Sequence, residues 1–142
     1  MLQQTNIEII DQLIDLLNDI DSAVYKNALQ PLHFSTVGQH VRHITEFYLC
    51  ALKGHGNGVI DYDARERNLL IEIDKDFTIE LLEKVKTQLQ ALKSDHNLIL
   101  KSKFGGDEAL EIPSSFFREL TYLIEHTIHH LEIGRASCRE RV

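Results

Sequence analysis

The residues of this sequence that could do chemistry are its eight histidines. His126 and His130 are four positions apart, a spacing that places two imidazoles on one face of a helix, one turn apart. Both rings can then reach one metal ion at about 2.0–2.1 Å. Helical bundles complete such sites with a ligand from a facing helix, and His43 is the candidate. Three protein nitrogens leave one position open for water or substrate, as in catalytic zinc sites.

The competing interpretation is that these histidines are hydrogen-bonded core residues. Five of them fall on two predicted core helices, and burying so many ionisable rings without a partner is costly, which favours a metal. His129 is the alternative to His130 as a ligand, and His40 is the alternative to His43. Otherwise these two are either outer groups that orient the ligands or hydrogen-bonded core residues. The remaining histidines fall in loops or near helix ends and are predicted to be solvated: His33, His55 and His96.

Four segments carry apolar residues at helical spacing, and each follows a residue type that caps helices. We expect the first helix to end before Pro31, because proline disfavours helix in the residue before it. Glycines at positions 54, 56 and 58 end the second. The predicted N-caps, in chain order, are Asn6, then Ser35 or Thr36, then Thr78, then Ser114 or Ser115.

Two connecting segments differ from these helices. Residues 59–76 are polar and charge-dense, which predicts a crossover loop with about one short helical turn. Residues 97–112 place short apolar runs around Gly105 and Gly106, which predicts a β-hairpin packed on the helices. The expected fold is all-α: a four-helix bundle with a crossover connection and a small β-hairpin before the last helix.

Length and composition narrow the function classes. A chain of 142 residues suits one domain, and a net charge of −7 without a basic stripe disfavours nucleic-acid binding. No apolar run approaches the roughly 20 residues that cross a bilayer, and no signal peptide is evident. The two cysteines give no disulfide framework, and Cys50 is expected to be a small core residue. We therefore expect a cytoplasmic protein with no membrane partner.

The last ten residues differ from the rest of the chain. They are rich in arginine and are expected to break the preceding helical pattern. From Glu132 onward, EIGRASCRERV looks like a sequencing adapter translated in frame. We expect a domain at residues 1–132, cut short at its C-terminus, and a non-native tail at residues 133–142.

With these residues in view, the chain resembles the DinB-like superfamily of metal-dependent helical proteins, which includes YfiT-like proteins. The resemblance covers about residues 5–131, and its motifs are residues 35–43, 126–130 and, as in one branch, 61–67. It implies a four-helix bundle with a crossover and a divalent site at His43, His126 and His130. Different members hold zinc, nickel or iron. Many members continue past the second motif, and this chain departs from them there.

The resemblance also implies a function, because characterised relatives include thiol S-transferases and a thiol-dependent isomerase. The first hypothesis is a metal-dependent thiol S-transferase acting on a small thiol and an electrophile, with one ion, zinc before nickel or iron. Arg65 or Arg67 would hold an anionic substrate group, unless they simply pair with neighbouring acids. The alternatives are a metal-dependent hydrolase and a non-enzymatic metal- or small-molecule-binding module. For the hydrolase, Glu46 and Glu125 are conceivable bases, although each is expected on the surface. A homodimer is a further expected partner.

Overall fold

The computed structural model describes residues 1–28 and 35–140, with side chains described through residue 133. Short helices and turns connect four long helices. The helices are α1 (Leu2–Asp19), α2 (Ser22–Lys26), α3 (Val37–Asn57), the 3₁₀-helix η2 (Tyr62–Ala64), α4 (Leu69–Ile73), α5 (Lys75–Ala91) and α6 (Phe116–Glu140). The strands are β1 (Val59–Ile60), β2 (Asn97–Ser102) and β3 (Leu110–Ser115). The first helix was predicted to continue to Pro31, and this is wrong: α1 ends at Asp19, and the separate helix α2 follows after the extended Ile20 and the N-cap Asp21. Pro31 and His33 themselves lie outside the described residues.

The prediction of an all-α four-helix bundle is wrong, and so is the fold that the family resemblance implied. The described residues form six α-helices and a three-stranded mixed sheet in the order β1-β2-β3. The hairpin of β2 and β3 was expected, and its register pairs Asn97 with Ser115. The parallel pairing of β1 with β2, Val59 opposite Ile99, was not expected. A strand of two residues after the left-handed Gly58 is too short to show an alternating pattern.

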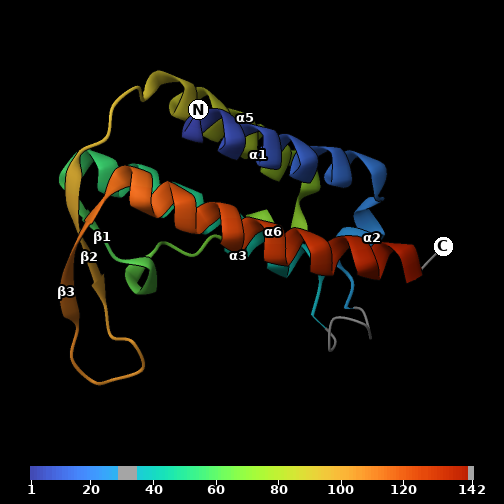
Figure 1. The fold of residues 1–142 in the computed structure, drawn as a ribbon. Coiled ribbons are helices and arrows are strands. Elements are labelled where there is room, and N and C mark those ends of the chain that lie inside the picture. The colour runs from blue at the N-terminus through green and yellow to red at the C-terminus, as the bar shows by residue number, and fades with distance from the viewer. Residues whose placement is uncertain (29–34, 141–142) are drawn as a thin grey trace.

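The long helices lie in two layers, with α1 beside α5 and α3 beside α6 (Figure 1). The sheet covers one end of the helices, and the described chain ends at the other (Figure 1). Between the layers lies one core, whose fully buried side chains include Leu17, Ile44, Tyr48, Leu82 and Leu120. No helix in the described part of the chain combines the length and apolarity needed to cross a membrane.

Capping residues explain where the site helices begin. Thr36 and Gln39 form a capping box that starts α3, and the Ser115 hydroxyl accepts a hydrogen bond from the Arg118 amide at the start of α6. The predictions for Asn6 and Thr78 are wrong, because both are fully buried inside helices. Asn6 accepts the Tyr48 hydroxyl at 2.6 Å, and the Thr78 hydroxyl donates to the Ile71 carbonyl at 2.8 Å. Good capping side chains are thus used here as buried hydrogen-bonding groups.

The chain was expected to leave the helical pattern after Glu132, but α6 continues through Glu140. The segment contains arginine, alanine and glutamate, which favour helix, and it has no proline to end one. The non-native origin of residues 133–142 stays a prediction.

A close approach between backbones seats α3 against α4. A Cβ added at Gly38 would overlap the carbonyl oxygen of Glu72, whereas one added at Gly56 on the same helix would meet nothing within 4 Å. Gly38 therefore permits the contact between α3 and α4 on the side of α3 that carries Arg42.

We expect Gly38→Ala to lower the free energy of unfolding by about 1–3 kcal/mol, because the added methyl overlaps rigid backbone. Gly56→Ala is the matched control and should raise it by up to about 1 kcal/mol, since alanine favours helix more than glycine. Urea denaturation of both variants measures the difference. Equal stabilities would show that the close approach does not limit the residue at position 38.

Candidate metal centre

The structure brings the three predicted ligands together where α3 packs against α6. His43 lies on α3, and His126 and His130 lie one turn apart on α6. One nitrogen from each ring lies within 4.8 Å of the other two, and the ring centroids are 4.8–5.0 Å apart. An ion at about 2.0–2.1 Å from each nitrogen would draw them to roughly 3.4 Å from one another. Small side-chain rotations would therefore be enough for coordination.

Burial keeps these imidazoles neutral. Desolvation, and then the nearby charges of Arg65 and His40, lower the pKa of His43 to about 4. Desolvation and the neighbouring histidines lower the pKa of His130 to about 4 and that of His126 to about 3. Each ring therefore has an unprotonated nitrogen at neutral pH, which is the form that binds metal.

The surroundings of the rings fit a divalent cation. Nδ1 of His126 is buried and has no hydrogen-bond partner, an arrangement that costs free energy in a protein interior. Three neutral nitrogen donors without a thiolate or a carboxylate form a ligand set that suits zinc, nickel or iron. One open position remains for water or a ligand.

The two alternative ligands have different surroundings. Nδ1 of His40 lies 3.0 Å from Nδ1 of His130, so one of these nitrogens donates and the other accepts. If His130 donates, its Nε2 keeps a lone pair for a metal, and His40 acts as the outer partner that orients it. His129 is exposed and lies outside the three-histidine cluster, with its ring 5.6 Å from that of His130.

Aromatic side chains pack against one side of the three-histidine cluster. Phe47 stacks on His126 with ring centroids 4.3 Å apart, and Tyr62 also stacks on Phe47, at 4.7 Å. The Tyr62 hydroxyl donates to Glu119 at 2.9 Å, and burial beside this carboxylate raises the pKa of the phenol. Phe47 follows His43 by four residues on α3, a spacing that places both on one helix face, but no such spacing links Tyr62 to the site. Its only sequence signal is its place within residues 61–67.

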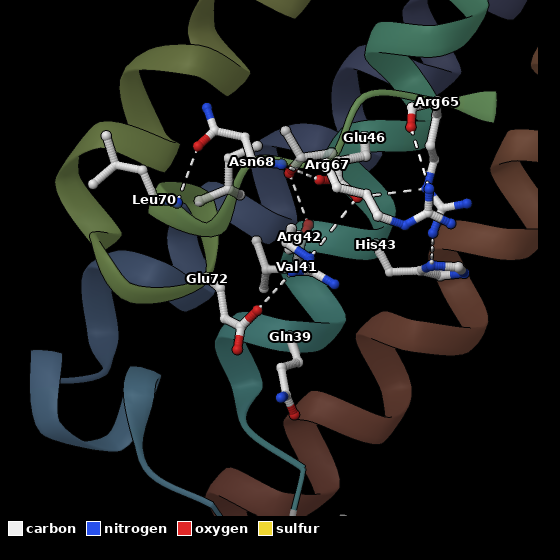
Figure 2. A network of polar contacts seen from close by, with 12 residues as sticks. Gln39, Val41, Arg42, His43, Glu46, Arg65, Arg67, Asn68, Leu70 and Glu72 are labelled. Atoms are coloured by element: carbon white, nitrogen blue, oxygen red, sulfur yellow. Dashed lines mark hydrogen bonds and ion pairs between the residues drawn. The ribbon is translucent and has the colours of Figure 1, made fainter. Parts of the chain in front are cut away.

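Arg65 and Arg67, the two candidate anion-binding residues, separate in the structure. Nη2 of Arg65 lies 3.4 Å from Nδ1 of His43, and only 12% of the Arg65 side chain is exposed. Arg67 is exposed and donates to the Arg65 carbonyl at 3.4 Å. Figure 2 shows Arg65 reaching from its loop to His43 on α3.

Glu46 was expected on the surface, and that expectation is wrong. Its carboxylate is 1% exposed, accepts the Asn68 amide at 2.7 Å and lies between Arg42 and Arg65, at 3.8 and 3.5 Å (Figure 2). The segment from Asp61 to Asn68 folds over α3 and brings Arg65 and the Asn68 amide to Glu46, which helical spacing alone does not reveal. Glu125, the other conceivable base, is exposed.

The remaining candidate residues lie away from the cluster. Cys50 is partly buried, its pKa is raised by burial, and its thiol donates to the Asp61 carbonyl at 3.4 Å. It lines a cavity of about 380 Å³ whose wall includes Glu46 and Arg65 but none of the histidines. His55 and His96, expected to be solvated, are instead partly buried, with their rings 4.1 Å apart.

Comparison with known proteins gives no relative: no family model, curated protein or solved structure matches this chain significantly. The resemblance to DinB-like proteins stays a prediction, and the case for the site rests on its geometry.

The lowered pKa values predict how the metal-free protein responds to pH. Below about pH 6.5 the unfolded chain protonates its histidines while the folded protein keeps these three neutral. The free energy of unfolding should therefore fall as the pH drops from 6.5 toward 4. Denaturation with a chelator present, at several pH values, measures the slope. His126→Gln should flatten it, and identical slopes in the two proteins would contradict the assignment.

Proposed function

We propose that this protein binds one divalent metal ion, zinc before nickel or iron, through His43, His126 and His130. One observation carries the proposal: three neutral imidazoles from two packed helices present nitrogens within 4.8 Å of one another. The orphaned Nδ1 of His126 supports it, since this buried nitrogen has no partner within the protein. The resemblance of residues 35–43 and 126–130 to DinB-like motifs agrees with the same three ligands.

We propose further that the site serves transfer of a small thiol to an electrophile. A divalent ion held by the three histidines would lower the pKa of a small thiol and so supply a thiolate near neutral pH. The thiol proton leaves to solvent, the sulfur forms a bond to the electrophilic carbon, and the leaving group departs with its bonding pair. In this chain the histidines hold the site, His40 orients His130, and Phe47 shields one side of His126 from water.

Metal binding should depend on the three ligands and not on their neighbour. We expect one Zn²⁺ per chain in the native sequence. His43→Ala, His126→Ala or His130→Ala should each weaken affinity by more than about 100-fold, beyond the usual effect of losing an outer partner. Competition against a chromophoric chelator measures the affinity. His129→Ala is the matched control and should bind like the native protein. Equal metal content in all five proteins would rule the site out.

We expect His40 to affect metal affinity by orienting the His130 ring. His40→Ala removes the hydrogen bond between His40 and the His130 ring, and should weaken Zn²⁺ binding about 10- to 100-fold. His40→Gln can still accept from Nδ1 and should restore part of the loss. The same competition assay serves here. If His40→Ala binds as tightly as His129→Ala, His40 does not orient the ligand.

The reaction class is tested with metal-loaded protein, several small thiols and an aryl halide. Thiol-dependent release of halide, lost in His126→Ala, is the expected result. Turnover of an activated ester by water alone would replace this proposal with a hydrolase. Tight thiol binding without turnover would replace it with a binding module.

A further inference from the structure

Arg65 borders the histidine cluster and is held in place from three sides. Its Nη1 donates to the Tyr62 carbonyl at 2.9 Å, and its Nε lies 3.5 Å from Oε1 of Glu46. The guanidinium also lies over the Phe47 ring, 4.9 Å from the centroid. These contacts leave Nη2 directed at Nδ1 of His43, 3.4 Å away. The position of this cation beside a candidate ligand is therefore set by the fold.

The contact between Arg65 and His43 constrains the imidazole. A guanidinium only donates hydrogen bonds, so Nδ1 of His43 must accept, and the neutral ring then carries its proton on Nε2. A metal ion also needs an unprotonated nitrogen of this ring. An ion at Nδ1 would displace Arg65, whereas an ion at Nε2 would move the proton to Nδ1 and set two donors against each other. Metal binding therefore breaks this hydrogen bond in either case.

The charges around Arg65 add to the conflict. Arg42 and Arg65 pair with Glu46, and Arg42 also pairs with Glu72 at 2.9 Å, so these four side chains have no net charge. Three imidazoles in the form that binds metal are also uncharged, so the ligands themselves bring no negative charge. A divalent ion would add two positive charges beside a nearly buried guanidinium whose own charge is already paired with Glu46. At low effective dielectric such repulsion is strong unless an anion comes with the ion.

We propose that Arg65 couples metal binding to a small carboxylate-bearing ligand. Alone, the guanidinium opposes the cation at His43. With the ligand present, Nη2 donates to the carboxylate, and the anion balances the charge of both cations. The inference rests on the proposed metal site and names the substrate class for it: the thiol or its electrophile carries a carboxylate. By linkage, metal tightens carboxylate binding by the same factor as carboxylate tightens metal binding.

The experiment measures Co²⁺ affinity by absorption, in a non-coordinating buffer, with and without propionate. In the native protein, propionate should tighten Co²⁺ binding at least about fivefold. Arg65→Gln should bind Co²⁺ more tightly than the native protein when propionate is absent, because the opposing charge is gone. It should also lose the response to propionate. A residue with a merely structural role would weaken metal binding when removed, so the direction of change separates the two roles.

Arg67→Gln is the matched control. Arg67 lies two residues after Arg65 and is exposed, so this variant removes the same charge from a side chain on the surface. It should behave like the native protein. Arg65→Lys keeps the positive charge but loses the forked donor geometry, so it should still oppose Co²⁺ and respond weakly to propionate. If Arg65→Gln does not fold by circular dichroism, the native protein and Arg65→Lys carry the comparison.

Two thiols distinguish where the carboxylate resides. If 3-mercaptopropionate binds the Co²⁺ protein more tightly than 2-mercaptoethanol does, and the difference disappears in Arg65→Gln, the thiol carries it. If propionate still tightens Co²⁺ binding when 2-mercaptoethanol is bound, the second substrate carries it. The inference is overturned if Arg65→Gln matches the native protein in Co²⁺ affinity and in propionate response while the histidine variants lose metal. Absence of Co²⁺ binding by the native protein would remove the proposed function as well.

Discussion

The contact between α3 and α6 is the interaction on which the rest of the site depends. His43 comes from one helix and the pair His126 and His130 from the other, so only their packing makes a cluster. Their burial has an energetic cost, since the rings must stay neutral below the pH at which free histidine takes up a proton. An ion bound by the three rings would offset this cost, because it would bind the folded protein and not the unfolded chain.

The segment between α3 and α5 supplies residues that contact the site but that the two site helices do not carry. Tyr62 stacks on Phe47, Arg65 reaches His43, and the Asn68 amide closes on Glu46. A buried carboxylate between two guanidiniums is favourable only when its hydrogen bonds are also satisfied. Here the Asn68 amide donates to Oε2 of Glu46, whereas Oε1 has no hydrogen bond and only faces Arg42 and Arg65 at 3.8 and 3.5 Å. The segment is thus part of the site, although it contains little regular structure.

The three histidines and the guanidinium of Arg65 favour ligands of opposite charge. The histidines offer lone pairs and call for a cation, whereas the guanidinium of Arg65 offers donors and calls for an anion. Because Arg65 contacts His43, a cation bound alone would be repelled by the guanidinium, and an anion bound alone would leave the histidine nitrogens without a ligand. A cation and an anion that arrive together satisfy both, which is the physical basis for expecting a charged ligand on the metal.

The sequence alone determined the elements that repeat locally. The spacing of His126 and His130, a helix cap at Ser35 or Thr36 and a hairpin within residues 97–112 follow from helical periodicity, capping and turn chemistry. The structure selects Thr36 as the cap and extends the second strand of the hairpin to Ser115. Only the tertiary structure decided the strand pairing and the burial of polar residues, because both depend on contacts between distant segments. Only the folded chain shows that β1 joins β2, that Asn6 and Thr78 are buried instead of capping, and that Glu46 lies inside. It also separates Arg65 from Arg67 and His40 from His129, pairs that local spacing cannot distinguish.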